Sequence, residues 1–170
     1  DGSHSWFFPI LFEDGHYLAL DKMTHMAVSH SPAFPDRPSL SKLIQDAVAA
    51  QARWTTKRDI RHLWFAYRID FETSGISLFC KNNEARQKIG DLLGANEEKR
   101  EFHCLVHGPP GEESFEVAAK IGWVPGRPEI MKAGKQGKQA RTRFEIVERF
   151  AGVPLLKCLP DTDRKQQIRA

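Results

Sequence analysis

Short apolar runs of strand length, separated by glycine- and proline-containing turns, recur along this 170-residue chain and constrain its fold more than any other feature. The sequence predicts strands at 6–12, 16–21, 67–81 (broken by a turn at Thr73-Ser74-Gly75), 102–107, 114–121, 140–150 and 153–159. An Asp-Gly pair at 14–15 indicates that the first two strands form a hairpin. Strands outnumber helices and do not alternate regularly with them, which predicts an α+β domain with a mixed, largely antiparallel sheet.

Two segments show the periodicity of helices instead. Between residues 39 and 53 the apolar side chains share one helical face: Leu40, Leu43, Ile44, Ala47 and Val48. A second helix is expected to start at Asn82 or Asn83, whose side chains can cap it, and to end at Gly94. Residues 31–38 contain three prolines and are predicted to form a loop.

The distribution of charge is compatible with a nucleic acid partner. The net charge of +3 is mildly basic, and 41% hydrophobic and 28% charged residues are ordinary values for a globular domain. Cations alternate with aromatic residues between 53 and 68, and others lie among glycines between 132 and 143. Because RNA is bound through phosphate contacts and base stacking, each stretch is either an RNA contact or a solvated basic surface. Residues 122–137 are predicted to form a long loop, which either contacts RNA or is a flexible surface excursion.

The cysteines, the lengths of the apolar runs and the motifs limit the classes of protein to which the chain could belong. Cys80, Cys104 and Cys158 lie far apart, and each belongs to an apolar run, which indicates reduced core residues of a cytoplasmic protein. No apolar run is long enough to span a membrane, and no secretory signal is visible. No zinc, metalloprotease or phosphate-loop motif occurs, so no metal site is predicted. Residues 1–5 are expected to be a vector-derived remnant outside the fold.

One carboxylate is a candidate nucleophile. Asp70 lies two residues after Arg68 and just before Thr73-Ser74-Gly75, and a second cationic element, R-K-Q-Q-I-R, occupies 164–169. In an extended backbone Arg68 and Asp70 would point to the same face. A carboxylate among cations, in a chain without a metal motif, indicates a nucleophile that acts on an anionic polymer, and a surface ion pair is the alternative.

Five segments, in order, resemble the RluA-type pseudouridine synthase family. Residues 67–75, Y-R-I-D-F-E-T-S-G, resemble the signature H-R-L-D-x-x-T-S-G, and residues 163–169 resemble the element G-R-T-H-Q-I-R. Residues 17–31 resemble the opening strand, lysine and following loop of the family. Residues 102–108 resemble its strand Y-x-A-L-x-x-G, and residues 137–142 resemble its segment G-K-x-A-x-T. Together the five segments span nearly the whole chain.

The resemblance implies one catalytic domain over 6–170, with a pseudouridine-synthase-like α+β fold whose sheet is flanked by helices and loops. It implies isomerisation of specific uridines in structured rRNA or tRNA to pseudouridine, without a cofactor or a metal. The protein is expected to be cytoplasmic and monomeric, with no membrane partner. Family members usually continue past the position of Ala170 with another strand and loop, so the chain is expected to be truncated there.

The resemblance also implies roles for individual residues. Asp70 matches the catalytic aspartate, which attacks the target nucleotide at the sugar or at the base. Arg169 matches the arginine that pairs with it, and a guanidinium near a carboxylate favours the ionised form. Arg68 matches an arginine that holds RNA after the target base has flipped out, and Arg164 belongs to the same substrate-binding set. Ile168 matches an apolar residue beside the pocket, with core packing as the alternative.

Several positions depart from the family pattern. Phe102 stands where most members have a tyrosine that stacks on the target base. A phenylalanine ring can still stack, which is worth about 1–3 kcal/mol per base, but it has no hydroxyl to take part in removing the C5 proton. Tyr67 replaces the signature histidine, and Asp163, Lys165 and Gln166 replace the glycine, threonine and histidine of the last element.

These departures leave a second class of function open, a non-catalytic RNA-binding protein whose pocket has drifted. The retained Asp70 and Arg169 favour the enzyme. A third interpretation, a nuclease or hydrolase that uses acid–base pairs, lacks a second carboxylate at motif spacing. Lys22 matches the lysine after the opening strand of the family and is expected to be structural or to face RNA rather than to be catalytic.

Overall fold

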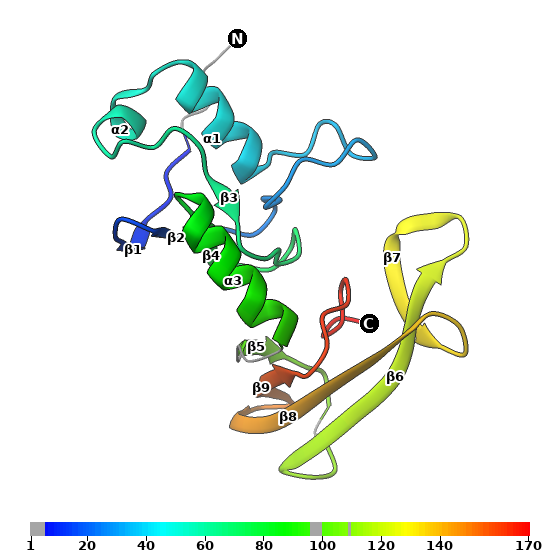
Figure 1. Cartoon of the computed structure of the whole chain (residues 1–170). Coiled ribbons are helices and arrows are strands. Elements are labelled where there is room, and N and C mark those ends of the chain that lie inside the picture. Colours follow the sequence, from blue (N-terminus) through cyan, green and yellow to red (C-terminus); the bar gives the residue numbers. More distant parts are fainter. Residues whose placement is uncertain (1–5, 96–99, 109) are drawn as a thin grey trace. The chain divides into compact units, whose positions relative to one another are not determined.

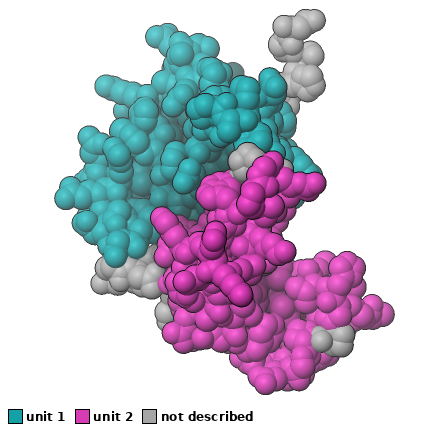
Figure 2. Space-filling model, turned by 90° about the vertical axis from the view of Figure 1, so that its right-hand side faces the viewer, with its two compact units in different colours: residues 1–95 teal, residues 96–170 magenta. Residues whose placement is uncertain are grey.

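The structure is a computed structural model that describes residues 6–95, 100–108 and 110–170. The chain forms two compact units, residues 1–95 and 96–170, and each is described by itself (Figure 2). The expected remnant at 1–5 lies outside the described residues.

A four-stranded antiparallel sheet forms the centre of the first unit, with its strands in the order β1-β2-β4-β3 (Figure 1). The elements of this unit are β1 (Ile10–Glu13), β2 (Tyr17–Lys22), α1 (Leu40–Ala49), α2 (Arg53–Thr56), β3 (Trp64–Phe65), β4 (Gly75–Cys80) and α3 (Asn83–Ala95). The predicted β1–β2 hairpin is confirmed. A carboxylate oxygen of Asp14 accepts hydrogen bonds from the backbone N–H groups of His16 (2.8 Å) and Tyr17 (2.6 Å), which closes the turn.

Side-chain caps start the two longer helices where the sequence places them. The hydroxyl of Ser39 accepts a hydrogen bond from the N–H of Lys42 (3.4 Å), and the amide oxygen of Asn82 accepts one from the N–H of Ala85 (2.9 Å). Helix α1 stops short of the predicted end at residue 53, because Gln51 adopts a left-handed backbone conformation (φ 50°). The core of the first unit includes these side chains of β2, α1 and β4: Leu18, Leu20, Leu40, Ile44 and Phe79.

The signature segment forms the loop of a β3–β4 hairpin, so the strand predicted from Tyr67 is wrong. The two strands pair antiparallel, and the N–H of Ala66 still donates to the carbonyl of Leu78 (2.8 Å) before the chain leaves the ladder. The N–H of Thr73 then donates to the carbonyl of Asp70 (3.1 Å). The turn therefore lies at 70–73 rather than at 73–75, and it places Asp70 in a loop that projects from the sheet.

A five-stranded antiparallel sheet forms the second unit, in the order β5-β9-β8-β6-β7 (Figure 1). Its strands are β5 (Phe102–Leu105), β6 (Ser114–Val124), β7 (Arg127–Gly134), β8 (Lys138–Phe150) and β9 (Val153–Pro160). Phe144, Leu156 and Cys158 are the buried centre of its core. Helices together with antiparallel sheets confirm the α+β class, with two sheets where the sequence predicts one.

The prediction of a long loop at 122–137 is wrong, because the end of β6, a two-residue turn and the whole of β7 lie in this segment. Val124 pairs with Arg127 around Pro125-Gly126, and Gly126 has the positive φ (73°) that the second position of a type II turn requires. After β7, a second turn places Gly137 (φ +114°) against β6. A Cβ atom on Gly137 would lie 2.1 Å from the carbonyl oxygen of Ile121.

Candidate active site

Asp70 is half-buried in the β3–β4 loop of the first unit. Tyr67, at the position of the signature histidine, donates a hydrogen bond from its hydroxyl to the carbonyl of Ile76 in β4 (3.3 Å). This bond and the turn at 70–73 connect the loop to the sheet. Arg68 is exposed on the same loop. Because residues 67–70 are not a strand, the argument that Arg68 and Asp70 share one strand face no longer applies.

A buried lysine lies within electrostatic reach of the Asp70 loop. Lys22 is the last residue of β2 and is 0% exposed. Its ammonium group donates hydrogen bonds to the carbonyls of Met23 (3.0 Å) and Met26 (2.8 Å). Burial lowers the pKa of Lys22 from 10.5 to about 8, while the negative charges of Asp70 and Glu72 act to raise it. Lys22 is therefore mostly a cation at neutral pH, and its role in the backbone turn is structural, as one alternative from the sequence had it.

Aromatic and cationic side chains surround Phe71, the residue after Asp70. The ring of His25 meets the Phe71 ring edge-on, with 5.5 Å between the centroids. The guanidinium carbon of Arg37 lies 4.6 Å from the Phe71 centroid and 3.9 Å from that of Phe34. Each cation–π contact is worth about 0.5–1 kcal/mol at a site open to solvent. These contacts link the chain between β2 and α1 to the turn that carries Asp70.

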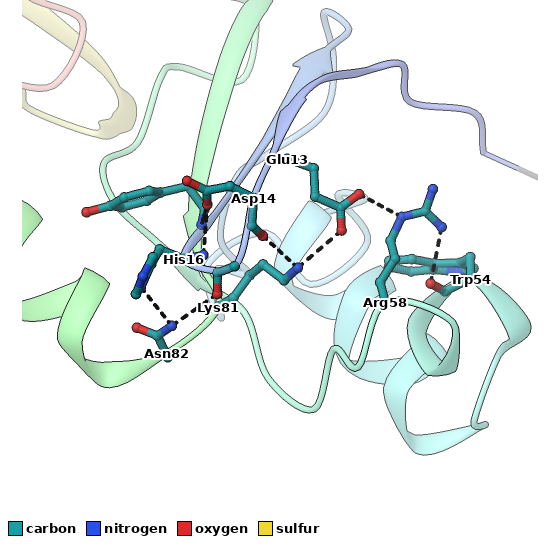
Figure 3. Close-up of polar contacts among 9 residues, drawn as sticks. Glu13, Asp14, His16, Trp54, Arg58, Lys81 and Asn82 are labelled. Carbon is teal, nitrogen blue, oxygen red and sulfur yellow. Dashed lines mark hydrogen bonds and ion pairs between the residues drawn. The ribbon is translucent and has the colours of Figure 1, made fainter.

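A network of charges occupies the opposite end of the β2–β4 pair (Figure 3). The carboxylate of Glu13 forms ion pairs with Nε of Arg58 (2.9 Å) and with Nζ of Lys81 (3.2 Å). Lys81 also donates to the carbonyl of Asp14 (2.9 Å), and Arg58 to the carbonyl of Trp54 (3.3 Å). Lys81, which ends the signature, and Arg58, which belongs to the basic stretch at 53–68, are thus both engaged within the first unit.

Two of the predicted site residues pack together in the second unit. Phe102 of β5 and Ile168 are half-buried and lie against the Phe144, Leu156 and Cys158 cluster. Ile168 also lines a cavity of about 700 Å³. Ile168 is therefore part of the core, and its role beside a substrate pocket stays a prediction.

Gln167 anchors the last motif of the chain to β8. Its amide nitrogen donates to the carbonyl of Arg141 (2.9 Å) and to the hydroxyl of Thr142 (2.9 Å). Its amide oxygen accepts from the hydroxyl of Thr162 (2.8 Å) and from the N–H of Arg164 (3.0 Å). The sequence interpretation singled out the residues around Gln167 and missed it, although the family element has glutamine at this place.

Two further residues of the last motif have partners in the second unit. Nε of Arg164 donates to the carbonyl of Gln139 (3.0 Å), which adds a second connection to β8. Asp163, which replaces the glycine of the family, forms an ion pair with Arg100 (3.2 Å). The acid at this position is thus compensated by a cation of the same unit.

The expected pair of Asp70 and Arg169 joins residues of different units and stays a prediction. Arg169 is exposed and belongs to the second unit, as does Gln166, whose amide oxygen accepts a hydrogen bond from the N–H of Met131 in β7 (2.8 Å). The structure thus packs Phe102 and Ile168 against one core and places Asp70 within electrostatic reach of Lys22, which the sequence did not indicate.

Two further findings concern the described residues, which are 6–95, 100–108 and 110–170. Among them, no three histidine, cysteine, aspartate or glutamate side chains come together in a way that could bind a metal ion. No helix within these ranges combines the length and the apolar character needed to cross a lipid bilayer.

Curated RNA pseudouridine synthases are among the known proteins that are similar to this chain. Ribosomal large subunit pseudouridine synthase C of Escherichia coli is 28% identical over 162 residues, which cover 94% of this chain and 47% of the relative. The uncharacterized RNA pseudouridine synthase YlyB of Bacillus subtilis is 27% identical over 160 residues, which cover 94% of this chain and 52% of the relative. The chain thus spans about half the length of these curated relatives.

Solved structures with the same fold are also known. Human RNA Pseudouridylate Synthase Domain Containing 1 matches with a TM-score of 0.72 and 19% identity, over 96% of this chain and 63% of that chain. Human RNA Pseudouridylate Synthase Domain Containing 4 matches with a TM-score of 0.71 and 16% identity, over 94% and 61%. A family model described as RNA pseudouridylate synthase matches residues 16–170. Because that range contains all five resembling segments, the chain belongs to the RNA pseudouridylate synthase family, in its RluA-type branch.

Proposed function

We propose that the protein is an RNA pseudouridine synthase that isomerises specific uridines of structured rRNA or tRNA, with Asp70 as the nucleophile. The observation that carries the proposal is the setting of Asp70. It stands at the catalytic position of the family signature, half-buried in a loop, with the buried cation Lys22 in electrostatic reach. A nearby cation favours the ionised carboxylate, which is the form that can act as a nucleophile.

The proposed reaction needs only a rearrangement of bonds in the target nucleotide. The carboxylate of Asp70 attacks either the sugar or the base, and the bond between C1′ of the ribose and N1 of uracil breaks. The uracil turns, and its C5 bonds to C1′ in place of N1. A proton leaves C5, another is gained at N1, and Asp70 is released, so the product is an isomer of the substrate. Phe102 has no hydroxyl, so another group or a water molecule must take the C5 proton.

The substrate side of the proposal rests on the exposed cations and on the names of the relatives. Arg68 is exposed on the loop that carries Asp70, where it could fill the place that a flipped base vacates. Phe102 and Arg164 would contact the substrate from the second unit, with Ile168 and Arg169. The Escherichia coli relative is named for the large ribosomal subunit. We further propose that residues 6–170 act as one catalytic domain, in the cytoplasm and as a monomer.

A second candidate function is a non-catalytic RNA-binding protein on the same scaffold. Gln166 favours it, because this residue takes the place of the family histidine and its amide oxygen accepts a hydrogen bond from the backbone of Met131. The absence of a hydroxyl on Phe102 points the same way. Both candidates predict RNA binding, and only the enzyme predicts turnover.

The experiment that separates the two candidates is tritium release from RNA labelled at C5 of uridine. It uses the natural-length protein and RNA from a strain that lacks the gene. Asp70→Asn is nearly isosteric, so thermal stability and RNA binding should persist while the rate falls on the order of 10⁴-fold or more. Asp21→Asn makes the same chemical change at an exposed position of β2 and should keep the wild-type rate.

Each result has a clear meaning. If the wild type releases tritium and Asp70→Asn releases it equally fast, Asp70 is not the nucleophile. If the wild type binds RNA and releases no tritium, the binding protein is the better description.

A further inference from the structure

Two cysteines of the second unit face each other across neighbouring strands. In the β5–β9 ladder Phe102 pairs with Cys158 and Cys104 pairs with Leu156, so the two cysteines are diagonal neighbours on one face of the sheet. Their sulfur atoms lie 3.4 Å apart. A disulfide bond is about 2 Å long, so the sulfurs would have to approach by roughly 1.4 Å to become bonded. Both cysteines are free thiols in the structure.

The two thiols differ in their access to solvent. Cys158 is 0% exposed, inside the core cluster of the unit. Cys104 is half-buried and lines the cavity of about 700 Å³, together with His107, Gly111 and Glu112. A small reagent that enters this cavity reaches Cys104, and Cys158 lies directly behind it.

The hydrogen bond between the thiols also makes them chemically unequal. It lowers the pKa of Cys104 to about 7, against an opposing effect of burial, and it raises the pKa of Cys158, as burial also does. Cys104 is therefore the thiol that ionises first. Thiolates rather than thiols react with oxidants, so the reactive form is on the accessible residue.

We propose that Cys104 and Cys158 form an oxidative modification site, at which a peroxide converts the two thiols into a reversible disulfide. The thiolate sulfur of Cys104 attacks the peroxide and the O–O bond breaks. The departing oxygen takes up the proton that Cys104 gave up on ionising, so a sulfenic acid and one molecule of water (or alcohol) result. The sulfur of Cys158 then attacks the sulfur of Cys104 and displaces the hydroxyl, which leaves as water with the Cys158 proton. Two thiols are oxidised and one peroxide is reduced.

The disulfide would be easy to reduce. Diagonal neighbours in an antiparallel pair have Cα atoms about 7–8 Å apart, beyond the range of about 4.4–6.8 Å that is usual for a disulfide. Forming the bond must therefore draw β5 and β9 together. A strained disulfide has a more oxidising potential, which suits a transient bond in a reducing compartment.

The bond would also move a residue of the proposed site. Phe102 precedes Cys104 by two positions on β5 and pairs with Cys158 across the ladder. Drawing the strands together would shift the ring that is proposed to stack on the target base, so oxidation should lower turnover. This consequence rests on the proposed function, whereas the chemistry of the thiols does not.

The test is peptide mapping of the full chain after treatment with hydrogen peroxide in the native state. A Cys104–Cys158 cross-linked peptide is expected to appear, lighter than the two thiol peptides by two hydrogen atoms, and to disappear with dithiothreitol. Cys80 is the internal control, because it is 1% exposed and burial raises its pKa. Cys104 should react at least about tenfold faster than Cys80, and its alkylation rate should rise as the pH passes about 7.

Two variants identify the order of the steps. Cys158→Ser leaves Cys104 without its resolving thiol, so a sulfenic acid on Cys104 should persist and be trapped by dimedone. Cys104→Ser should abolish the fast reaction altogether.

The mapping of the wild type needs no variant and decides the proposal by itself. A cross-link that forms only in denaturant, or a Cys80 that reacts as fast as Cys104, overturns it. Formation of the cross-link in a protein that releases no tritium would keep the modification site and refute only the proposed enzyme.

Discussion

Each end of the β2–β4 pair has a lysine and two carboxylate residues beside a turn. The lysine, however, forms different interactions at the two ends. At one end Lys81 contacts Glu13 directly (3.2 Å), and the Asp14 carboxylate closes the β1–β2 turn. At the other end Lys22 is buried and donates to the backbone carbonyls of Met23 and Met26. It acts on Asp70 and Glu72 through its charge.

This difference predicts which end of the β2–β4 pair contributes to folding stability and which end contributes to the reaction. An ion pair in contact occupies the oxygens of its carboxylate, as Glu13 illustrates with its two cationic partners. A buried cation whose hydrogen bonds go to backbone carbonyls acts on a nearby carboxylate through its charge, which favours the ionised form. The end with the Glu13 ion pairs is therefore expected to matter for folding, and the end with Lys22 for the reaction.

Among the variants at the two ends, Lys22→Met should cause the largest loss of activity. It removes the buried charge near Asp70 and the hydrogen bonds that order the turn at 23–26, so the rate of tritium release should fall on the order of 10²-fold, the usual effect of misplacing a catalytic group by about 1 Å. Wild-type activity should also decline above about pH 8 as Lys22 loses its proton, and the variant should lack that decline. An unchanged rate in a folded Lys22→Met protein would show that Lys22 does not contribute to the reaction.

The same variant tests the pH dependence of stability. The pKa of Lys22 is about 8 in the folded protein and 10.5 as its ordinary value, so between these pH values the unfolded chain binds more protons than the folded one. The free energy of unfolding of the wild type should therefore rise relative to that of Lys22→Met as the pH increases through this window. Urea denaturation of both proteins at several pH values measures the difference, and parallel curves would contradict it.

Phe71→Leu should have a smaller effect at the same end. It removes the contacts with Arg37 and His25 and should cost about 1–2 kcal/mol in the free energy of unfolding. Because the residue adjoins Asp70, kcat should also fall several-fold while KM changes little. Phe34→Leu removes the other Arg37 contact at a residue that does not adjoin Asp70 in the chain, and it is the matched control that should keep kcat. Equal kcat values for the two variants would show that Phe71 does not position Asp70.

Lys81→Met should affect stability alone. It removes one of the two cations that contact Glu13, at a site where the Lys81 side chain is 14% exposed, so the free energy of unfolding should fall by about 1 kcal/mol. Turnover per folded molecule should match that of the wild type. A loss of turnover comparable to that of Lys22→Met would erase the distinction between the two ends.

The smallest expected effect concerns RNA binding by the basic stretch at 53–68. The guanidinium of Arg58 is bound to Glu13, whereas Lys57 is exposed. Lys57→Gln should therefore reduce the slope of log affinity against log salt by about 0.9, the value for one phosphate contact, and Arg58→Gln should change it less. Filter binding with structured RNA between low and moderate salt measures both slopes, and an equal change in both would mean that the ion pair of Arg58 opens on binding.

Local signals predicted those parts of the fold that depend on few residues. The Asp14-Gly15 turn, the start of α1 at about residue 39 and the cap at Asn82 are predicted correctly, because each depends on hydrogen bonds within three residues along the chain. The β6–β7 hairpin was missed although Pro125-Gly126 marks its turn. Most described side chains of β7 are exposed, and the alternation of apolar and polar residues that indicates a strand is present in β6 but absent from β7.

The site was only partly predictable for a different reason. Asp70 was found through the family signature, but its loop conformation was not, since the signature reads as a strand with a turn. The sequence predicts only a structural or RNA-facing role for Lys22. Lysine is almost never fully buried, and nothing in the sequence shows that its ammonium group will bind the carbonyls of Met23 and Met26. Gln167 depends on contacts with residues about 25 positions earlier in the chain, which no local pattern reports.

The turn at Gly137 has a practical consequence for directed evolution of this protein. The arm formed by β6, β7 and the turn that follows β7 is an obvious target for a randomised library, because its described surface is largely solvent-exposed. At residue 137, however, every side chain would meet the backbone of Ile121 and Gly122, and the φ of +114° is itself unfavourable for any L-residue other than glycine. Selection for altered RNA preference should therefore return glycine at this codon in every folded clone, and the codon can be left constant without loss of diversity.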